Sequence, residues 1–353
     1  MNERLARAFM DEGHQVRIVT FTLQYPDVLF PGKSQTDDRP KPPFVIERCI
    51  NSINPFNWIR VGMAIRRMKP DLIVVKYWIP FMAPCFGTIL RLARSNKHTR
   101  AIAILDNLIP HEKRPFDRAF TRYFVDAVDG FVALSRSVLN DIDLFDKSRP
   151  RLFNPHPVYD HFGEPLEPAT ARKELQLNPS GKYILFFGFI RDYKGLDLLL
   201  KAMPLIQTEG VKLIIAGEFY NNEKNYQKLI DELGVRDRVV LHTSFIPDER
   251  VRYYFSAADV VVQPYKTATQ SGVTQIAYHF EKPMIVTNVG GLPEMVPHQK
   301  AGFVCDADPG AIARAIDDFY QCDPGSFVPT LRAKQVEYSW KTMVNNILGL
   351  VES

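Results

Sequence analysis

The stretch from Tyr183 to Ala202, YILFFGFIRDYKGLDLLLKA, constrains the fold more than any other part of the sequence. Its apolar beginning predicts a buried strand, and its leucine-rich end predicts a helix. The short loop between them carries Gly188, Arg191, Lys194 and Gly195. Such a loop brings two cations and unpaired backbone N–H groups to the positive end of a helix, which suits a phosphate or pyrophosphate. The alternative is that both cations are solvated loop charges.

The length, charge and cysteine content of the chain limit the number of domains and the kinds of partner that it can have. A length of 353 residues is too great for one ordinary core and predicts two domains. The 44 Lys and Arg against 40 Asp and Glu give a formal charge of +4, which does not predict a nucleic-acid partner but is compatible with contact with an anionic membrane surface. The four cysteines are far apart in the sequence, so neither a zinc site nor a disulfide framework is predicted.

The start of the chain and its hydropathy bear on location. Residues 1–14 lack the apolar core of a signal peptide, and no long apolar run is present. The expectation is a cytoplasmic protein, with a peripheral position at the inner face of the membrane as the alternative.

Apolar strand patterns alternate with helical patterns along both halves of the chain. Their repetition predicts doubly wound parallel sheets, and therefore an α/β fold. The expected strands lie at residues 14–21, 72–77, 101–106 and 130–135 in the first half, and at 183–187, 211–216, 238–242, 260–263, 284–287 and 302–305 in the second.

A proline-rich segment, Asn154 to Pro168, interrupts this alternation and is typical of an interdomain linker. We therefore expect an N-terminal domain over residues 1–158 and a second domain over 159–330. The remaining residues, 331–353, are expected to form a helix that crosses back to the domain junction. Two such domains imply a cleft, with ligands bound outside the carboxyl ends of the strands.

Four loops of the second half follow strand ends, at residues 188–195, 217–219, 264–272 and 288–294. Their order and spacing resemble the donor-nucleotide domain of family 4 glycosyltransferases, which are retaining enzymes with the GT-B fold of two facing Rossmann-like domains. The resemblance places Lys194 against the donor pyrophosphate, with Arg191 as a second cation.

The resemblance also implies that several residues, among them Glu218, Glu294 and the TQSG loop at 269–272, bind the donor. Each of these three has a structural alternative: Glu218 could cap a turn, Glu294 could stabilise a helix dipole, and the TQSG loop could simply begin a helix. The family's usual pair of glutamates is absent from the window 268–276, so the chain resembles the subgroup with a TQSG loop. The donor-binding set is Gly188, Gly195, Glu218, Phe245, Ile246, Thr269, Gln270, Ser271, Gly272 and Glu294.

In the first half, the loop DNLIPHE follows a strand end. The resemblance places Asp106, Asn107 and Glu112 on the acceptor or sugar side and His111 in catalysis, although a loop histidine is often a surface hydrogen-bonding group. The aromatic run at residues 77–84 is either core or the border of a lipid-bearing acceptor site. The family's first strand and Gly-rich loop have no counterpart, so the N-terminal domain is expected to be incomplete.

The resulting prediction is a retaining glycosyltransferase that moves a hexosyl or related sugar from a nucleoside-diphosphate sugar to a glycan or lipid-linked acceptor hydroxyl. It needs no metal and no cofactor, and it has no nucleic-acid partner. One alternative is a catalytically impaired subunit that binds nucleotide sugars. A further alternative is a sugar-phosphate synthase or phosphorylase, which would differ only in its acceptor.

Overall fold

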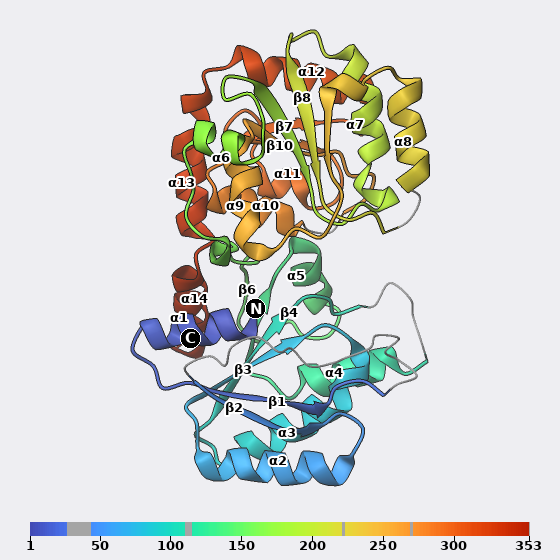
Figure 1. The fold of residues 1–353 in the computed structure, drawn as a ribbon. Coiled ribbons are helices and arrows are strands. Elements are labelled where there is room, and N and C mark those ends of the chain that lie inside the picture. Colours follow the sequence, from blue (N-terminus) through green and yellow to red (C-terminus); the bar gives the residue numbers. More distant parts are fainter. Residues whose placement is uncertain (27–43, 110–114, 221–222, 269–270, 353) are drawn as a thin grey trace. The chain divides into compact units, whose positions relative to one another are not determined.

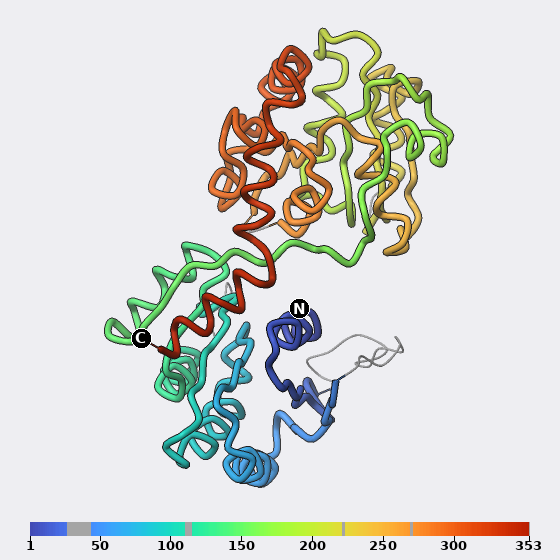
Figure 2. The backbone as a smooth tube through the Cα atoms, turned by 90° about the vertical axis from the view of Figure 1, so that its left-hand side faces the viewer, coloured from blue at the N-terminus to red at the C-terminus, as the bar shows by residue number. Residues whose placement is uncertain are grey.

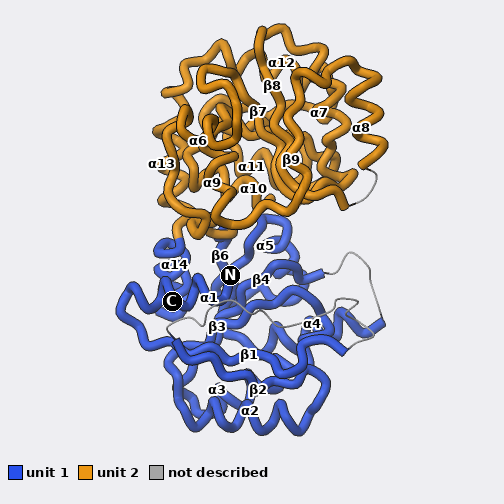
Figure 3. The backbone as a smooth tube through the Cα atoms, in the orientation of Figure 1, with its two compact units in different colours: residues 1–155, 340–353 blue, residues 156–339 orange. Residues whose placement is uncertain are grey.

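The structure is a computed structural model that describes residues 1–26, 44–109, 115–220, 223–268 and 271–352 (Figure 1). The chain forms two compact units (Figure 3). Unit 1 consists of residues 1–155 and 340–353, and unit 2 consists of residues 156–339. None of the described helices is both long and apolar enough to cross a bilayer.

Unit 2 is a single six-stranded parallel sheet with the strand order β12-β11-β10-β7-β8-β9. The chain begins at the central strand β7, moves outward to β9, and then returns to the other side of β7 through β10. All six strands predicted for this half are present. Their bounds are β7 Lys182–Phe187, β8 Val211–Ala216, β9 Val239–His242, β10 Val260–Gln263, β11 Met284–Thr287 and β12 Gly302–Cys305.

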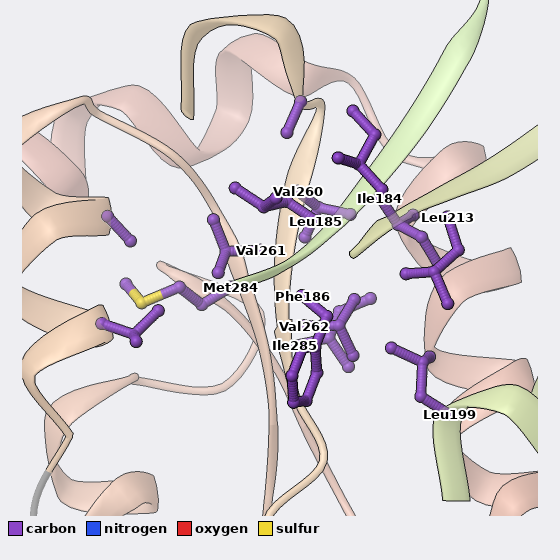
Figure 4. Packing of buried hydrophobic residues seen from close by; sticks show 14 of the residues in the cluster. Ile184, Leu185, Phe186, Leu199, Leu213, Val260, Val261, Val262, Met284 and Ile285 are labelled. Carbon is purple, nitrogen blue, oxygen red and sulfur yellow. The ribbon is translucent and has the colours of Figure 1, made fainter. Parts of the chain in front are cut away.

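The core of unit 2 explains why these strands could be predicted from the sequence. Ile184, Leu185 and Phe186 of β7 lie between Val260 to Val262 of β10 and Leu213 of β8, with Leu199 packed on one face (Figure 4). Strands covered on both faces become continuous apolar runs. The covering helices are α6 Pro168–Glu174, α7 Leu196–Ala202, α8 Glu223–Glu232, α9 Asp248–Ala257, α10 Gly272–His279, α11 Leu292–Met295, α12 Pro309–Gln321 and α13 Val328–Glu337.

Unit 1 has two parallel sheets, β1-β2 and β3-β4-β5-β6. The strands β2 and β6 were not predicted. The strand predicted at 72–77 is β3, which lies at an edge of its sheet, and only Tyr77 in it is fully buried. The bounds are α1 Asn2–Asp11, β1 Arg17–Leu23, β2 Val45–Asn51, α2 Pro55–Met68, β3 Leu72–Tyr77, α3 Ala83–Arg94, β4 Arg100–Leu105, α4 Asp117–Val125, β5 Gly130–Ala133, α5 Arg136–Ile142, β6 Arg151–Phe153 and α14 Trp340–Glu352.

The C-terminal segment differs from the single helix expected over residues 331–353. The helix α13 ends at Glu337 within unit 2, and the separate helix α14 belongs to unit 1. Trp340, Met343 and Ile347 of α14 pack with α1 and with strands β4 and β5. Figure 2 shows this red terminal segment ending in the unit that also holds the blue N-terminus. The unit boundaries fall at 155/156 and 339/340, where the sequence placed them at 158/159 and 330/331.

The aromatic run at residues 77–84 is part of the unit 1 core. Tyr77, Met82 and Ala83 are fully buried, and Trp78 packs against the same cluster. Of the two interpretations of this run, core burial is therefore the one the structure favours.

Candidate functional site in unit 2

The loop after β7 is held against the extension of β8. Its backbone N–H groups at Gly188 and Ile190 donate to the carbonyls of Ala216 and Glu218 at 2.9 and 2.8 Å, and Tyr220 N–H donates back to Ile190 at 3.1 Å. These bonds continue the β7–β8 ladder past the end of the sheet. The loop is therefore a fixed element at the carboxyl edge of the sheet.

The other end of the loop lies against the end of β10. A 3₁₀ turn, Asp192–Lys194, leads to Gly195 in the left-handed region with φ +68°, and α7 begins at the next residue. A Cβ atom at Gly195 would lie only 1.9 Å from the carbonyl oxygen of Pro264. The loop thus closes over the point where β7 meets β10, which is where the strand order of this sheet reverses and where ligands bind in sheets of this kind.

Lys194 is the chemically most unusual residue of this loop. Its side chain is 9% exposed, and none of the described residues forms an ion pair or hydrogen bond with its ammonium. Burial, with a smaller contribution from the Arg191 charge, lowers the pKa of Lys194 from 10.5 to about 8. A buried ammonium without a partner is costly, so the arrangement favours an anionic ligand at this place.

The carboxylates near the loop are engaged by a different lysine. Lys266 lies 2.9 Å from Asp192 and 3.0 Å from Asp197. Asp192 lies in the loop and Asp197 in the first turn of α7, so these two acidic side chains are the natural candidates to neutralise the loop. Because Lys266 holds both of them, Lys194 and Arg191 keep their positive charge available at the carboxyl edge.

A pocket of about 330 Å³ opens in front of Lys194. Gly188 forms part of its wall, and a Cβ atom at that position would lie 3.0 Å from the Lys194 ammonium. Ser271 and Gly272 border the pocket at the start of α10, and the Ser271 hydroxyl lies 3.2 Å from the Tyr265 hydroxyl. The complete lining is Tyr159, His161, Phe162, Phe187, Gly188, Phe189, Tyr193, Lys194, Tyr265, Ser271, Gly272, Val273 and Ile276.

The sequence-predicted donor residues do not all lie in this pocket. Gly188, Lys194, Ser271 and Gly272 line it, and Gly195 shapes the loop behind it. Thr269 and Gln270 lie outside the described residues. Three further segments lie apart from the lining: Glu218 after β8, Phe245 and Ile246 after β9, and the exposed Glu294 in α11.

The predicted residues of the first half belong to unit 1. Asp106 and Asn107 follow β4, and the Asp106 carboxylate is 2.8 Å from the ammonium of Lys76 on the neighbouring strand β3. This ion pair gives Asp106 a structural partner. His111 and Glu112 lie outside the described residues.

Three pocket residues come from the segment interpreted as a linker. Tyr159, His161 and Phe162 line the pocket, and Tyr159 stacks on His156 with ring centroids 4.8 Å apart. The sequence signal that could have found them is the clustering of four aromatic or histidine side chains within residues 156–162, which a flexible linker does not need.

Arg191 is exposed and lies over the ring of Tyr220, with its guanidinium carbon 4.4 Å from the ring centroid. Tyr220 follows β8 and is hydrogen-bonded through its backbone to the loop, so it can hold Arg191 at the carboxyl edge. Exposed cation–π contacts contribute about 0.5–1 kcal/mol.

We expect Tyr220→Ala to raise the KM for a nucleotide-sugar donor about threefold, because Arg191 loses the ring that orients it. Tyr220→Phe keeps the ring and should behave like the parent protein. In an Arg191→Ala background, Tyr220→Ala should have no further effect. Steady-state kinetics on the parent protein and the four variants measures this, and equal losses in both backgrounds would contradict the coupling.

The described residues contain no group of three or more His, Cys, Asp or Glu side chains placed to hold a metal ion.

Solved structures show which fold this is. A glycosyltransferase from Rickettsia africae ESF-5 matches 99% of this chain and 94% of its own length, with a TM-score of 0.71 and 17% identity. HepE of Anabaena in complex with UDP matches 87% of this chain and 86% of its own, with a TM-score of 0.66 and 16% identity. The fold is that of the GT-B glycosyltransferases, with two Rossmann-like domains.

The family follows from the two halves of the sequence. Residues 168–341 match Glycosyl transferases group 1, and residues 2–152 match Glycosyltransferase Family 4. These matches take up nearly the whole chain, which belongs to the family 4 type of glycosyltransferases, a class of enzymes that transfer sugars.

Curated relatives agree with this family over part of their length. A D-inositol 3-phosphate glycosyltransferase from Segniliparus rotundus is 32% identical over 148 residues, which are 40% of this chain and 33% of that protein. The chain spans between 33% and 42% of the length of three curated glycosyltransferases that it matches, this one included.

Proposed function

We propose that this protein transfers a sugar from a nucleoside-diphosphate sugar to an acceptor hydroxyl on a glycan or a lipid-linked sugar, with retention of configuration. The observation that carries the proposal is the buried ammonium of Lys194 at the strand crossover of unit 2, which forms no ion pair or hydrogen bond with any of the described residues. HepE of Anabaena, a protein of the same fold, is known in complex with UDP, which supports a nucleotide as part of the ligand.

In the proposed reaction the bond between the sugar C1 and the diphosphate oxygen breaks, and a bond from C1 to the acceptor oxygen forms on the same face. The acceptor proton passes to an oxygen of the departing diphosphate. Negative charge develops on that diphosphate, where Lys194, Arg191 and the start of α10 at Gly272 stabilise it. Preorganised groups of this kind contribute a few kcal/mol each, so the proposal requires neither a metal nor an organic cofactor.

Thermal stabilisation by a panel of UDP- and GDP-sugars tests the donor site, because a ligand that binds only the native state raises the melting temperature. Transfer and hydrolysis of the stabilising sugar are then measured with the same protein. Stabilisation with turnover supports the transferase. Stabilisation without either reaction would favour a nucleotide-sugar-binding subunit, and no stabilisation by any member would contradict the donor site.

The lowered pKa of Lys194 predicts a pH dependence of donor use. The ammonium is the form that attracts the diphosphate, and its pKa in the ligand-free protein is about 8. We therefore expect kcat/KM for the donor to fall about tenfold per pH unit above about pH 8. Bound diphosphate stabilises the charged form, so kcat should decline only at higher pH.

Lys194→Arg provides the control for this profile, because a guanidinium keeps its charge throughout the range. The variant should lose the decline in kcat/KM between pH 8 and 10, whatever its absolute rate. A decline that persists unchanged in this variant would assign it to another group.

A further inference from the structure

Unit 1 carries a helix whose outer face is both basic and apolar. The helix α2 packs inward through Val61, Gly62 and Ile65, and a Cβ atom at Gly62 would lie 2.8 Å from Leu92 of α3. On the outer side, Phe56 is 84% exposed and Ile59 is 49% exposed. Large apolar side chains so fully exposed on an ordered helix mark an interaction surface.

The charge on this helix is of one sign. Arg60, Arg66 and Arg67 are exposed, and α2 contains no acidic residue. The sequence from residue 52 to residue 76 contains five basic residues and one acidic residue, Asp71. The Asp71 carboxylate already has a partner, because its Oδ1 lies 2.8 Å from His98 Nε2. Figure 1 shows α2 as the outermost helix on its side of unit 1, with α3 directly behind it.

The basic character continues from the end of α2 into a neighbouring pocket. Asn96 donates to the carbonyl of Arg66 at 3.3 Å, which joins the end of α2 to the turn after α3. That turn borders a pocket of about 360 Å³ lined by Arg94, Lys97, His98, Thr99, Arg100 and Asp129. Asp129 is held by Arg94 and by the N–H of Ala101 at 2.8 Å, so the pocket keeps an excess of positive charge.

We propose that the α2 face, defined as Ile53, Phe56, Ile59, Arg60, Arg66 and Arg67, docks unit 1 onto an anionic phospholipid surface. A helix with exposed aromatic and aliphatic side chains among arginines can lie in the plane of a membrane interface. The apolar side chains enter the headgroup region, and the arginines reach lipid phosphates. The basic pocket beyond α2 has room for a phosphate headgroup.

The same charge argues against a second copy of this chain as the occupant. A symmetric contact through the α2 face would set Arg60, Arg66 and Arg67 against identical residues. These like charges would repel one another across the contact, whereas an anionic lipid surface complements all of them.

Vesicle co-sedimentation of the full chain tests the proposal. Vesicles of phosphatidylcholine mixed with phosphatidylglycerol should bind the protein, pure phosphatidylcholine should bind it weakly, and added salt should release it. Arg66→Gln together with Arg67→Gln should weaken partitioning about thirtyfold, since each cation near an anionic surface contributes a factor of about five. Phe56→Ala with Ile59→Ala should weaken it about tenfold.

A matched control changes the same amount of charge elsewhere. Lys212→Gln with Lys224→Gln neutralises two exposed lysines of unit 2 and should leave vesicle binding unchanged. Equal loss in this control, equal binding to neutral vesicles, or no binding at all would overturn the proposal. So would equally tight binding to a duplex oligonucleotide, or a dimer in sedimentation equilibrium that Phe56→Ala dissociates.

The docking surface does not depend on the donor chemistry. The α2 variants should keep the thermal stabilisation by nucleotide sugars that is expected of the parent protein. If the α2 variants lose vesicle binding but are still stabilised by nucleotide sugars, the result concerns the docking surface alone. If the parent protein binds vesicles but no nucleotide sugar stabilises it, the proposed function fails while the docking surface stands.

Discussion

Replacing Lys194 with alanine is expected to lower kcat/KM for the nucleotide-sugar donor by about two to three orders of magnitude, with no loss of folding stability. The ammonium is buried and has no ion-pair or hydrogen-bond partner among the described residues, so its removal takes away a group that stabilises the departing diphosphate. It also removes a desolvated charge that the ligand-free fold must tolerate. The free energy of unfolding should therefore stay the same or rise.

Lys282 provides a matched control, because burial also lowers its pKa to about 8. Its ammonium donates to the carbonyls of Ala258 at 2.9 Å and Ser256 at 3.3 Å, near the end of α9. Lys282→Ala leaves these carbonyls unpaired and should cost about 2 kcal/mol of stability, with donor kinetics unchanged. Kinetics and denaturant unfolding of both variants separate the two roles, and an unchanged rate in Lys194→Ala would remove Lys194 from the mechanism.

Gly195→Ala should destabilise unit 2 by about 3 kcal/mol and abolish donor binding. The residue has a positive φ, which disfavours any Cβ atom, and that atom would also overlap the Pro264 carbonyl oxygen at 1.9 Å. Relief of this overlap requires the loop to move away from the end of β10. Lys194 and the start of α7 would move with it, so the anion site loses its geometry.

Gly210 separates the steric effect from the backbone effect. It has a similar φ of +76°, and no atom lies within 4 Å of a Cβ atom built there. Gly210→Ala should therefore cost only about 1 kcal/mol and leave donor binding intact. Urea unfolding compares the two substitutions, and equal losses of stability would show that the contact with Pro264 has no energetic consequence.

The donor-side unit could be predicted largely from the sequence. Its strands are covered on both faces, so they appear as continuous apolar runs such as YILFF and VKLIIA. In a parallel sheet the loops after such strands gather at one edge, which is why Gly188, Lys194 and Gly272 could be expected near one another. The first unit was harder to predict because β2, with Glu47 and Arg48 in its middle, lacks a clear apolar period.

Other residues were missed because their roles depend on distant partners. Tyr159 and His161 lie in a proline-rich segment, and only the packing of that segment beside α10 brings them to the pocket. Asp106 was assigned to the acceptor side from its position after a strand, and the structure gives it Lys76 as a partner across the sheet.

The sequence by itself determined that two cations, Arg191 and Lys194, stand in a loop between a buried strand and a helix start. That conclusion needs only local periodicity and the chemistry of a few neighbouring residues. Only the tertiary structure decided which lysine has no ion pair or hydrogen bond within the described part of the chain. Lys266 comes from the loop after β10 and holds Asp192 and Asp197, while Lys194 turns into the pocket. Burial and charge pairing join segments about seventy residues apart, and such contacts follow from the path of the whole chain, which local sequence patterns do not specify.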